Sequence, residues 1–509
     1  MTVYDVAVVG GGVVGAAVAR ALSRYRVSVV ILEKEADVSF GVSKANSGII
    51  HGGFHHPLTT LKARLEIRGN MMYDRLQEEL HFPFRRCGIL VAAFTEEEMK
   101  TVNLLYEQGA ANRSIGIELC NRERMRSLEP KLNPDVIGGL HAPCGGIVEP
   151  YRLVFSLVES ALKNGVELLT GFEVSGYDAA GGRSAGSASP PAAGGGPQGG
   201  DMLIRSADGR SVQARYAVNA AGLYADRVSG MLGGERFTLV ARKGEEYLMD
   251  RNARAFTGKV IFPVPSELSK GILVIPTVEG TTMVGPTADE VREREDVSTT
   301  AENFEKVFYF ARRLVPSVSE RDIITAFSGI RPALPDGDFF ISVSRENPRL
   351  VHAAGIQSPG LTAAPAIAER VRDLLVKAGL ELTADPSYDP NIEKVPRLRE
   401  MSVQEADART QRDRGFADIV CRCETVSEAE VLEAIQKGHT TLDGIKFYTR
   451  AGMGRCQGGF CTYKIMKILE RETGTPFDRI TKRGPGSRML LERLGDGKDP
   501  EHDLQGAGV

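Results

Sequence analysis

Four of the seven cysteines lie in two close pairs near the C-terminus and could bind a metal. Cys421 and Cys423 enclose one residue, and Cys456 and Cys461 enclose four. Thiolates in two such pairs hold zinc or an iron–sulfur cluster in proteins. The tight first pair favours a [2Fe-2S] cluster over one tetrahedral zinc ion, because zinc sites usually have about two to four residues inside each pair. Zinc stays the alternative, and we expect the other cysteines to be packing residues: Cys87, Cys120 and Cys144.

The residues around these pairs suit a group of negatively charged sulfurs. Several glycines can expose backbone N–H groups toward the thiolates, and basic side chains can offset their charge. These residues are Gly452, Gly454, Gly458, Gly459, Lys446, Arg450 and Arg455. Ser427 and Glu430 form a capping-box pattern, which predicts a helix that begins just after the first pair. A second helix is expected to begin near Cys461.

A glycine-rich motif near the N-terminus has the spacing of a nucleotide-binding turn. Gly10, Gly12 and Gly15 follow a β-branched run at 3–9 and open a helical pattern at 13–25. In such turns the first glycine permits the tight turn and the second lets the backbone approach a pyrophosphate. The third lets helix and strand pack closely, and the phosphates lie at the helix N-terminus. The sequence therefore predicts a dinucleotide site at this turn.

Glu33 ends a second apolar run at 27–32, where a carboxylate can accept hydrogen bonds from ribose hydroxyls. Strand, glycines, helix, second strand and acid all follow in order, although this motif alone does not decide between NAD and FAD. Segments 217–226 and 351–366 each read as a strand that ends in small residues before a helix. Both place backbone amides at a helix start, where an extended cofactor could be contacted again.

Other side chains could act on a substrate. Three of the eight histidines fall within six residues: His51, His55 and His56. A histidine, with an ordinary pKa of about 6.5, can accept a hydroxyl proton while hydride leaves the neighbouring carbon. Arg331, in an apolar stretch, could bind a carboxylate or phosphate through two parallel hydrogen bonds. Arg242 and Lys243 are weaker candidates for the opposite wall of such a pocket.

These residues are spread over 509 residues, a chain too long for one hydrophobic core. A hydrophobic content of 42% and a charged content of 25% argue against global disorder. The net charge of -3 provides no global field to attract nucleic acid. Residues 6–19 are apolar, but they are short for a membrane span and contain three consecutive glycines. We therefore expect a cytoplasmic protein without a transmembrane segment, with peripheral membrane contact still possible.

The chain divides by composition. Residues 1–380 mix β-branched runs with amphipathic patterns, which predicts an α/β domain with a Rossmann-type opening. A Gly/Ala/Ser/Pro-rich segment at 179–200 is expected to be a disordered inserted loop. Residues 381–415 are polar and proline-containing and are expected to be a linker. A small, mainly helical cysteine domain is predicted at 416–475, followed by a tail at 476–509.

The first 380 residues resemble the D-amino-acid-oxidase-type FAD-dependent oxidoreductases. The nearest branch holds glycerol-3-phosphate dehydrogenases and L-2-hydroxyglutarate dehydrogenases or oxidases. The matching segments are GGGVVG, ILEKE, SKANSGIIHGGFH, GGIVEPYRL, VNAAGLYAD, SGIRPAL and AGIQSPGLTAAPAIA. The cysteine segment resembles the bacterioferritin-associated-ferredoxin-like [2Fe-2S] domain, although that pattern has a shorter final pair, C-x-x-C.

The resemblance implies that FAD binds with its adenosine on Gly10–Glu33 and its isoalloxazine between the 43–53 loop and the 355–362 turn. The implied cofactor contacts in these two segments are Ser47, Gly48, Gly355, Gly360, Leu361 and Thr362. It implies that His51 lies against the flavin as base or orienting group, and that Arg331 binds the anionic group of the substrate. An inserted α+β substrate domain would be built mainly from 81–149 and 226–329.

The resemblance also implies a function: an FAD-dependent dehydrogenase that oxidises a small anionic alcohol, with glycerol 3-phosphate the leading substrate. Electrons would pass through the [2Fe-2S] cluster to an external acceptor or partner redox subunit. One feature opposes this substrate, because many membrane-linked glycerol-3-phosphate dehydrogenases have an arginine where this chain has His55. An L-2-hydroxyglutarate dehydrogenase or oxidase, an amino-acid or amine dehydrogenase, and a non-catalytic electron-transfer subunit therefore remain alternatives.

Overall fold

The computed structural model describes residues 2–179, 201–265 and 271–491 and divides the chain into two compact units. The first unit comprises Met1–Val395 and the second comprises Pro396–Val509. Most of the loop expected at 179–200 and the last part of the expected tail lie outside the described residues. None of the helices in the described ranges is long and apolar enough to cross a membrane.

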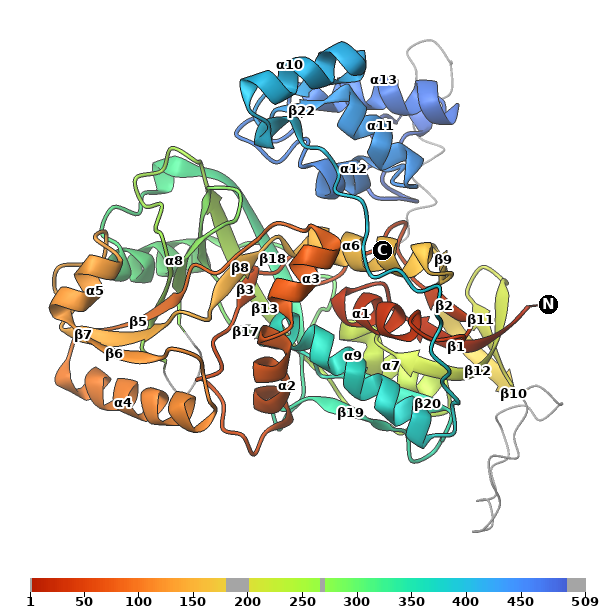
Figure 1. Ribbon diagram of the computed structural model, residues 1–509, viewed down its shortest axis with the longest axis horizontal. Helices are drawn as coiled ribbons and strands as arrows, with labels where there is room; N and C mark the ends of the chain where they lie inside the picture. Colours follow the sequence, from red (N-terminus) through yellow and green to blue (C-terminus); the bar gives the residue numbers. More distant parts are fainter. Residues whose placement is uncertain (1, 180–200, 266–270, 492–509) are drawn as a thin grey trace. The chain divides into compact units, whose positions relative to one another are not determined.

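The first unit contains an eight-stranded sheet with a parallel centre (Figure 1). The parallel strands, in spatial order, are β20 (Leu350–Ala354), β12 (Ser211–Asn219), β1 (Val3–Val9), β2 (Val29–Leu32) and β9 (Glu167–Leu169). Antiparallel strands complete the sheet: β10 (Val174–Ala179), β11 (Met202–Ser206) and β19 (Phe340–Val343). The central strands are almost fully apolar because both faces of a parallel sheet are covered.

Helices cover this sheet and position the loops at its strand ends. Helix α1 (Val13–Leu22) packs against both α6 (Pro150–Lys163) and α9 (Gly360–Lys377). Helix α7 (Ala225–Met231) packs on β10, β12 and β20. Helix α2 (Leu61–Asn70) packs on α9, and α3 (Tyr73–Leu80) follows it. The turns that enter α1 and α9 lie at the carboxyl ends of parallel strands, the usual place for ligand binding in such sheets.

A second sheet of nine strands forms the other half of this unit. Its order is β17 (Asp289–Val291), β13 (Val240–Met249), β16 (Thr282–Gly285), β15 (Leu273–Pro276), β14 (Val260–Pro263), β5 (Ile89–Ala93), β7 (Gly138–Ala142) and β6 (Glu118–Asn121). Strand β18 (Ile323–Ala333) pairs with β13 over most of its length. A small sheet is also present: β3 (Ile49–Ile50), β8 (Gly146–Val148) and β4 (Phe84–Arg85).

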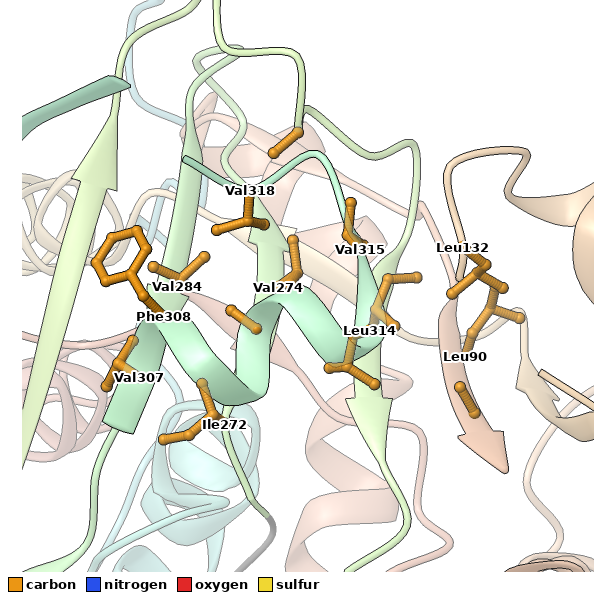
Figure 2. Close-up of a cluster of buried hydrophobic side chains, with 14 of the residues drawn as sticks. Leu90, Leu132, Ile272, Val274, Val284, Val307, Phe308, Leu314, Val315 and Val318 are labelled. Carbon is orange, nitrogen blue, oxygen red and sulfur yellow. The ribbon is translucent and has the colours of Figure 1, made fainter. Parts of the chain in front are cut away.

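Both faces of the nine-stranded sheet are apolar. Along β5, Ile89 and Val91 join one buried cluster while Leu90 and Ala92 join another, as the alternation of a strand requires. Helix α8 (Ala301–Leu314) covers the second cluster, where Phe308 packs among aliphatic side chains (Figure 2). The remaining helices of this half are α4 (Glu96–Ala111) and α5 (Arg122–Leu128). This rigid sheet carries the candidate substrate-binding residues on β13 and β18.

The second unit is small and mainly helical. Its helices are α10 (Val403–Arg412), α11 (Glu428–Gln436), α12 (Leu442–Thr449) and α13 (Cys461–Thr473), and its strands are β21 (Ile419–Cys421) and β22 (Val426–Ser427). Helix α11 begins at the predicted capping box, whose two reciprocal hydrogen bonds join Ser427 and Glu430. Helix α13 begins at Cys461, as the sequence predicts. Short 3-10 turns occur at Gly222–Tyr224, Glu320–Asp322, Leu398–Glu400, Arg414–Phe416 and Phe477–Arg479.

Two segments outside these domains are more ordered than the composition indicates. The segment expected to be a linker contains α10, which has its own capping box. The sequence of this helix lacks an apolar stripe, and none of its residues is buried. Part of the expected tail packs on α12 within the second unit, where Lys482 forms an ion pair with Asp443 at 2.9 Å. Within the first unit, the backbone after α9 adds a bridge between Tyr25 and Ala384.

Candidate active site and metal centre

The predicted nucleotide turn joins β1 to α1. Gly10 has φ +108°, and a Cβ there would lie 2.4 Å from the carbonyl oxygen of Ala220, so only glycine fits. A Cβ on Gly15 would lie 1.9 Å from the carbonyl oxygen of Gly10, which explains the close approach of helix and strand. Gly12 caps α1 and brings no side chain to the helix N-terminus, where N–H groups favour an anion. The turn therefore fits a pyrophosphate.

Glu33 lies directly beside this turn. Its Oε2 accepts a hydrogen bond from the Gly11 N–H at 2.6 Å, and its Oε1 accepts one from the Glu35 N–H at 2.8 Å. Burial raises the pKa of Glu33 above its ordinary value, and these two amides oppose that rise. A carboxylate fixed at the glycine turn is positioned to accept hydrogen bonds from an adenosine ribose.

The structure brings the 43–53 loop and the 355–362 turn together, although they are about three hundred residues apart in the chain. The His51 N–H donates to Thr362 Oγ1 at 3.0 Å, and Thr362 Oγ1 donates to the Ile49 carbonyl at 3.3 Å. His51 Nε2 lies 3.2 Å from Ser358 Oγ. The Tyr73 hydroxyl donates to the Leu361 carbonyl at 2.6 Å. These bonds fix the two segments that are implied to flank the flavin.

The glycines predicted in these two segments have structural reasons of their own. Gly48 and Gly355 both have positive φ. A Cβ on Gly48 would lie 2.4 Å from the carbonyl oxygen of Val148, and one on Gly360 would lie 2.5 Å from Ile356 Cγ2. Their contribution to cofactor binding, like that of Ser47, Leu361 and Thr362, stays a prediction.

His51 is buried and is held at both its backbone and its ring. Its carbonyl oxygen accepts a hydrogen bond from Asn70 Nδ2 at 2.6 Å. The ring centroid lies 6.0 Å from that of Phe262 and 5.7 Å from that of His55. His55 in turn packs between the rings of Phe54 and Phe262, at 4.1 Å and 5.3 Å. His55 thus takes part in aromatic packing.

Arg331 lies on β18, opposite Arg242 of β13. Its Nη2 donates to the Thr287 carbonyl at 2.5 Å, and its Nε donates to the Arg242 carbonyl at 3.4 Å. Burial lowers the pKa of Arg331, and the neighbouring carboxylate of Glu246 opposes that effect. Arg331 is partly buried, and a partly desolvated guanidinium binds an anion more strongly than a fully solvated one because water screens its charge less.

The two weaker cationic candidates have acidic partners. Arg242 forms an ion pair with Glu290 at 3.3 Å. Lys243 Nζ donates to Asp296 at 3.0 Å and to the Ser298 carbonyl at 3.1 Å. Their charges are therefore already compensated by acids of β17 and of the segment that follows it. The sequence alone indicated that Arg242 and Lys243 could form the opposite wall of the substrate pocket.

Glu246 is a residue that the sequence analysis missed. Its side chain on β13 is buried, with 3% of the residue exposed, and its Oε1 accepts a hydrogen bond from the Ser47 hydroxyl. Burial raises the pKa of Glu246 to about 7, while Ser47 and the charge of Arg331 lower it. The sequence feature that could have identified it is a pair of successive acids in an apolar strand. Successive side chains of a strand point to opposite faces of the sheet, so one of the two acids must face inward on each side. The other acid, Glu245, accepts hydrogen bonds at the start of α8.

The four cysteines of the second unit form two sulfur pairs. Cys423 Sγ lies 3.5 Å from Cys456 Sγ, and a hydrogen bond from the Cys461 thiol lowers the pKa of Cys421 to about 6. Charge interactions also join Cys423 to Cys421 and Cys461 to Cys456. Four sulfurs arranged as two pairs fit two irons with two thiolates each. In the described residues no three or more His, Cys, Asp or Glu side chains are grouped around one preformed ion position.

Backbone amides surround these sulfurs. The N–H groups of Gly452 and Glu424 bond to Cys421, and those of Gly458, Gly459 and Phe460 bond to Cys456. N–H···S bonds of this kind stabilise thiolate ligands of iron–sulfur clusters. A Cβ on Gly454 would lie 2.3 Å from Cys423 Cβ, so this glycine leaves room for the first pair. The donor set and its amides fit a [2Fe-2S] cluster.

The fold and the two sites define a flavin-dependent oxidoreductase with an appended iron–sulfur domain. Residues 5–374 match the family model "FAD dependent oxidoreductase", and the chain belongs to that family. Residues 419–471 match the "BFD-like [2Fe-2S] binding domain". The chain's cofactors are therefore FAD and a [2Fe-2S] cluster, as the sequence predicts. Zinc, the alternative for the cysteines, is not supported.

Individual proteins of known name are similar to this chain. The chain is 36% identical to a glycerol 3-phosphate dehydrogenase of Caloramator mitchellensis over 96% of this chain and 98% of that protein. It is 27% identical to the human mitochondrial L-2-hydroxyglutarate dehydrogenase over 73% of this chain and 88% of that protein. Among solved structures, the FAD-bound L-alpha-glycerophosphate oxidase of Mycoplasma pneumoniae is similar, with a TM-score of 0.71 and 28% identity. That match covers 78% of this chain and the whole of the oxidase.

Proposed function

We propose that this protein is a dehydrogenase that oxidises glycerol 3-phosphate to the corresponding ketone and delivers the electrons to an external acceptor. The observation that carries the proposal is the partly buried guanidinium of Arg331, which the Arg242 and Thr287 carbonyls hold in place. It lies on the strand that contacts the 43–53 loop, where a Cβ on Gly329 would lie 2.5 Å from the Ala45 carbonyl oxygen. The relative that matches 96% of the chain carries the name of this activity.

Arg331 would hold the phosphate of the substrate. A guanidinium offers two parallel N–H donors to a phosphate, which both neutralises the charge and orients the group. Its existing bonds to the Thr287 and Arg242 carbonyls hold the side chain in place before substrate binds. Such preorganisation saves the entropy of ordering the side chain when substrate binds.

His51 would accept the proton of the substrate hydroxyl. Its imidazole is buried, so water does not compete for the nitrogen, and Ser358 Oγ at 3.2 Å orients the ring. Loss of that proton from the hydroxyl oxygen, and of hydride from the carbon that bears the hydroxyl, converts the alcohol to a ketone. FAD, when bound, supplies the two-electron acceptor for this hydride.

The second unit favours a dehydrogenase over an oxidase. A [2Fe-2S] cluster, when bound to the four cysteines, supplies a one-electron centre. Such a centre is of little use to an enzyme that gives both electrons of each turnover directly to oxygen. We therefore propose that the acceptor is a separate redox partner, which receives electrons from the cysteine domain.

One observation favours a second candidate, L-2-hydroxyglutarate. His55 occupies the place of an arginine in many related enzymes and packs against Phe54 and Phe262. A carboxylate has fewer charges to neutralise than a phosphate, so Arg331 alone could suffice for it. Glu246 does not discriminate between the two candidates, because above pH 7 its buried negative charge near Arg331 would repel a phosphate as well as a carboxylate.

Steady-state kinetics with a dye acceptor test the proposal. The panel is glycerol 3-phosphate, L-2-hydroxyglutarate, an amino acid, an amine and uncharged glycerol. The kcat/KM for glycerol 3-phosphate should be higher than that for glycerol. The ratio should correspond to about 2–4 kcal/mol of additional transition-state stabilisation, which is typical of a desolvated charge pair. A higher kcat/KM for L-2-hydroxyglutarate would favour the second candidate. If every compound failed to turn over, the protein would be an electron-transfer subunit without a substrate.

A further inference from the structure

Two large aromatic side chains are exposed at the start of α13, beside the metal-binding cysteines. Phe460 is 81% exposed and Tyr463 is 58% exposed. Phe460 directly precedes Cys461, and its own N–H bonds to Cys456. Exposed aromatic surface next to a functional centre marks a contact site, since water contact with it is unfavourable.

The segments that carry the cysteines are rich in basic residues. Two fully described segments, 421–427 and 452–468, carry the four cysteines and contain a single acid, Glu424. That acid is buried and paired with Arg450 at 2.8 Å and with Arg399 at 3.1 Å. The exposed charged residues of the two segments are Arg422, Arg455, Lys464 and Lys467.

The end of the same helix has no such bias. Glu470, Arg471 and Glu472 alternate in sign, and Arg471 is bonded to Glu472 at 2.6 Å. Near the cysteines, by contrast, Lys467 Nζ lies 4.9 Å from the centre of the Tyr463 ring, so cation and aromatic surface are presented together. We name the surface of Arg422, Arg455, Phe460, Tyr463 and Lys467 the basic rim.

We propose that the basic rim docks an acidic one-electron carrier protein, which is the external acceptor of the proposed function. Charge complementarity selects the occupant, because the basic side chains of the rim attract an acidic surface and raise the rate of encounter. The exposed Phe460 supplies the apolar centre that a short-lived interface needs. The inference rests on the proposed function. In each encounter the oxidised carrier gains one electron and the metal centre loses one, without a change in covalent bonds.

The test uses the complete holoenzyme and an acidic flavodoxin as the probe. Binding is measured by calorimetry at low and high ionic strength for the wild type, Lys467→Glu and Phe460→Ser. Arg412→Glu is the matched control, since it makes the same charge change at an exposed position of α10. Visible absorbance first establishes that each variant carries its cluster and FAD.

The proposal predicts binding that weakens with added salt. At low salt it predicts a loss of affinity of about tenfold for Lys467→Glu and for Phe460→Ser, with less than a twofold change for Arg412→Glu. Equal affinity of all four proteins would overturn it, as would the absence of flavodoxin binding at low salt. Rim-dependent binding to anionic phosphatidylserine vesicles without flavodoxin binding would also overturn it and identify a membrane surface instead.

A second readout separates this inference from the proposed function. Anaerobic bleaching of FAD by glycerol 3-phosphate should be the same in Lys467→Glu as in the wild type. Slower bleaching would overturn the docking proposal, since the rim would then serve a step within the chain. If glycerol 3-phosphate bleached neither protein while flavodoxin binding remained rim-dependent, the substrate proposal would fail and the docking proposal would stand.

Discussion

Replacing Glu246 by glutamine should change how the stability of the protein depends on pH. The amide has nearly the shape of the carboxylic acid and keeps an oxygen that can accept from Ser47, but it does not titrate. Burial raises the pKa of Glu246 from its ordinary value of 4.5 to about 7. Between these values the folded protein retains a proton that the unfolded chain has released. The free energy of unfolding of the wild type therefore falls as pH rises through this window.

The size of the effect follows from the same two values. At 1.36 kcal/mol per pKa unit, the difference between 4.5 and about 7 corresponds to about 3 kcal/mol. The carboxylate is buried, so solvent screening does not reduce this figure. Between pH 5 and pH 8 the wild type should lose about 2–3 kcal/mol more unfolding free energy than Glu246→Gln.

Urea unfolding at several pH values provides the assay. FAD concentration is held constant because bound ligand adds to stability, and the transition of the first unit is followed by flavin fluorescence. Glu290→Gln is the control, because it removes an exposed carboxylate from the adjacent strand β17 and should follow the wild-type profile. Parallel profiles for the wild type and Glu246→Gln would refute the reasoning. A constant loss at every pH would indicate altered packing rather than titration.

Further predictions concern the cofactors and the substrate anion. Glu33→Ala should lower the affinity for FAD by removing the ribose acceptor, and flavin retention on dialysis measures this; undiminished retention would remove Glu33 from the site. Arg331→Lys should lower kcat/KM for glycerol 3-phosphate by about 2–4 kcal/mol, since a point charge does not replace the bidentate fork, and unchanged kinetics would exclude Arg331 from anion binding. Cys456→Ser should abolish the cluster's EPR signal and turnover with the acceptor while substrate still bleaches FAD; a retained signal would contradict the ligand assignment.

Local patterns allowed the nucleotide-binding part of the fold to be predicted. Strand β1 has the bounds expected from its β-branched run, because strand, glycines and helix are neighbours in the chain. The helix was predicted to reach Tyr25 but ends at Leu22. The cause is long-range: Tyr25 pairs with Ala384, and Arg26 N–H donates to the Thr383 carbonyl at 2.9 Å. A sequence pattern contains no information on such a distant partner.

In the candidate site, too, features set by neighbouring residues were predicted, and features set by long-range contacts were not. His51 and the 355–362 turn were placed together only through the family resemblance, since their contact spans most of the first unit. Glu246 was missed because its importance depends on Ser47 and Arg331, which reach it from distant segments. The ion pairs of Arg242 and Lys243 with residues of a later segment were missed for the same reason. The cysteine site was easier to predict, because four ligands in a short segment are visible in the sequence itself.

The central claim is that glycerol 3-phosphate is the substrate and that the first unit alone carries out its oxidation. Anaerobic titration of the holoenzyme with glycerol 3-phosphate, followed by flavin absorbance, tests it most directly. We predict that glycerol 3-phosphate bleaches the flavin and yields the ketone product, and that Arg331→Lys requires much higher concentrations. If the flavin stayed oxidised with glycerol 3-phosphate, or if L-2-hydroxyglutarate or an amine bleached it at lower concentration, the account would be contradicted.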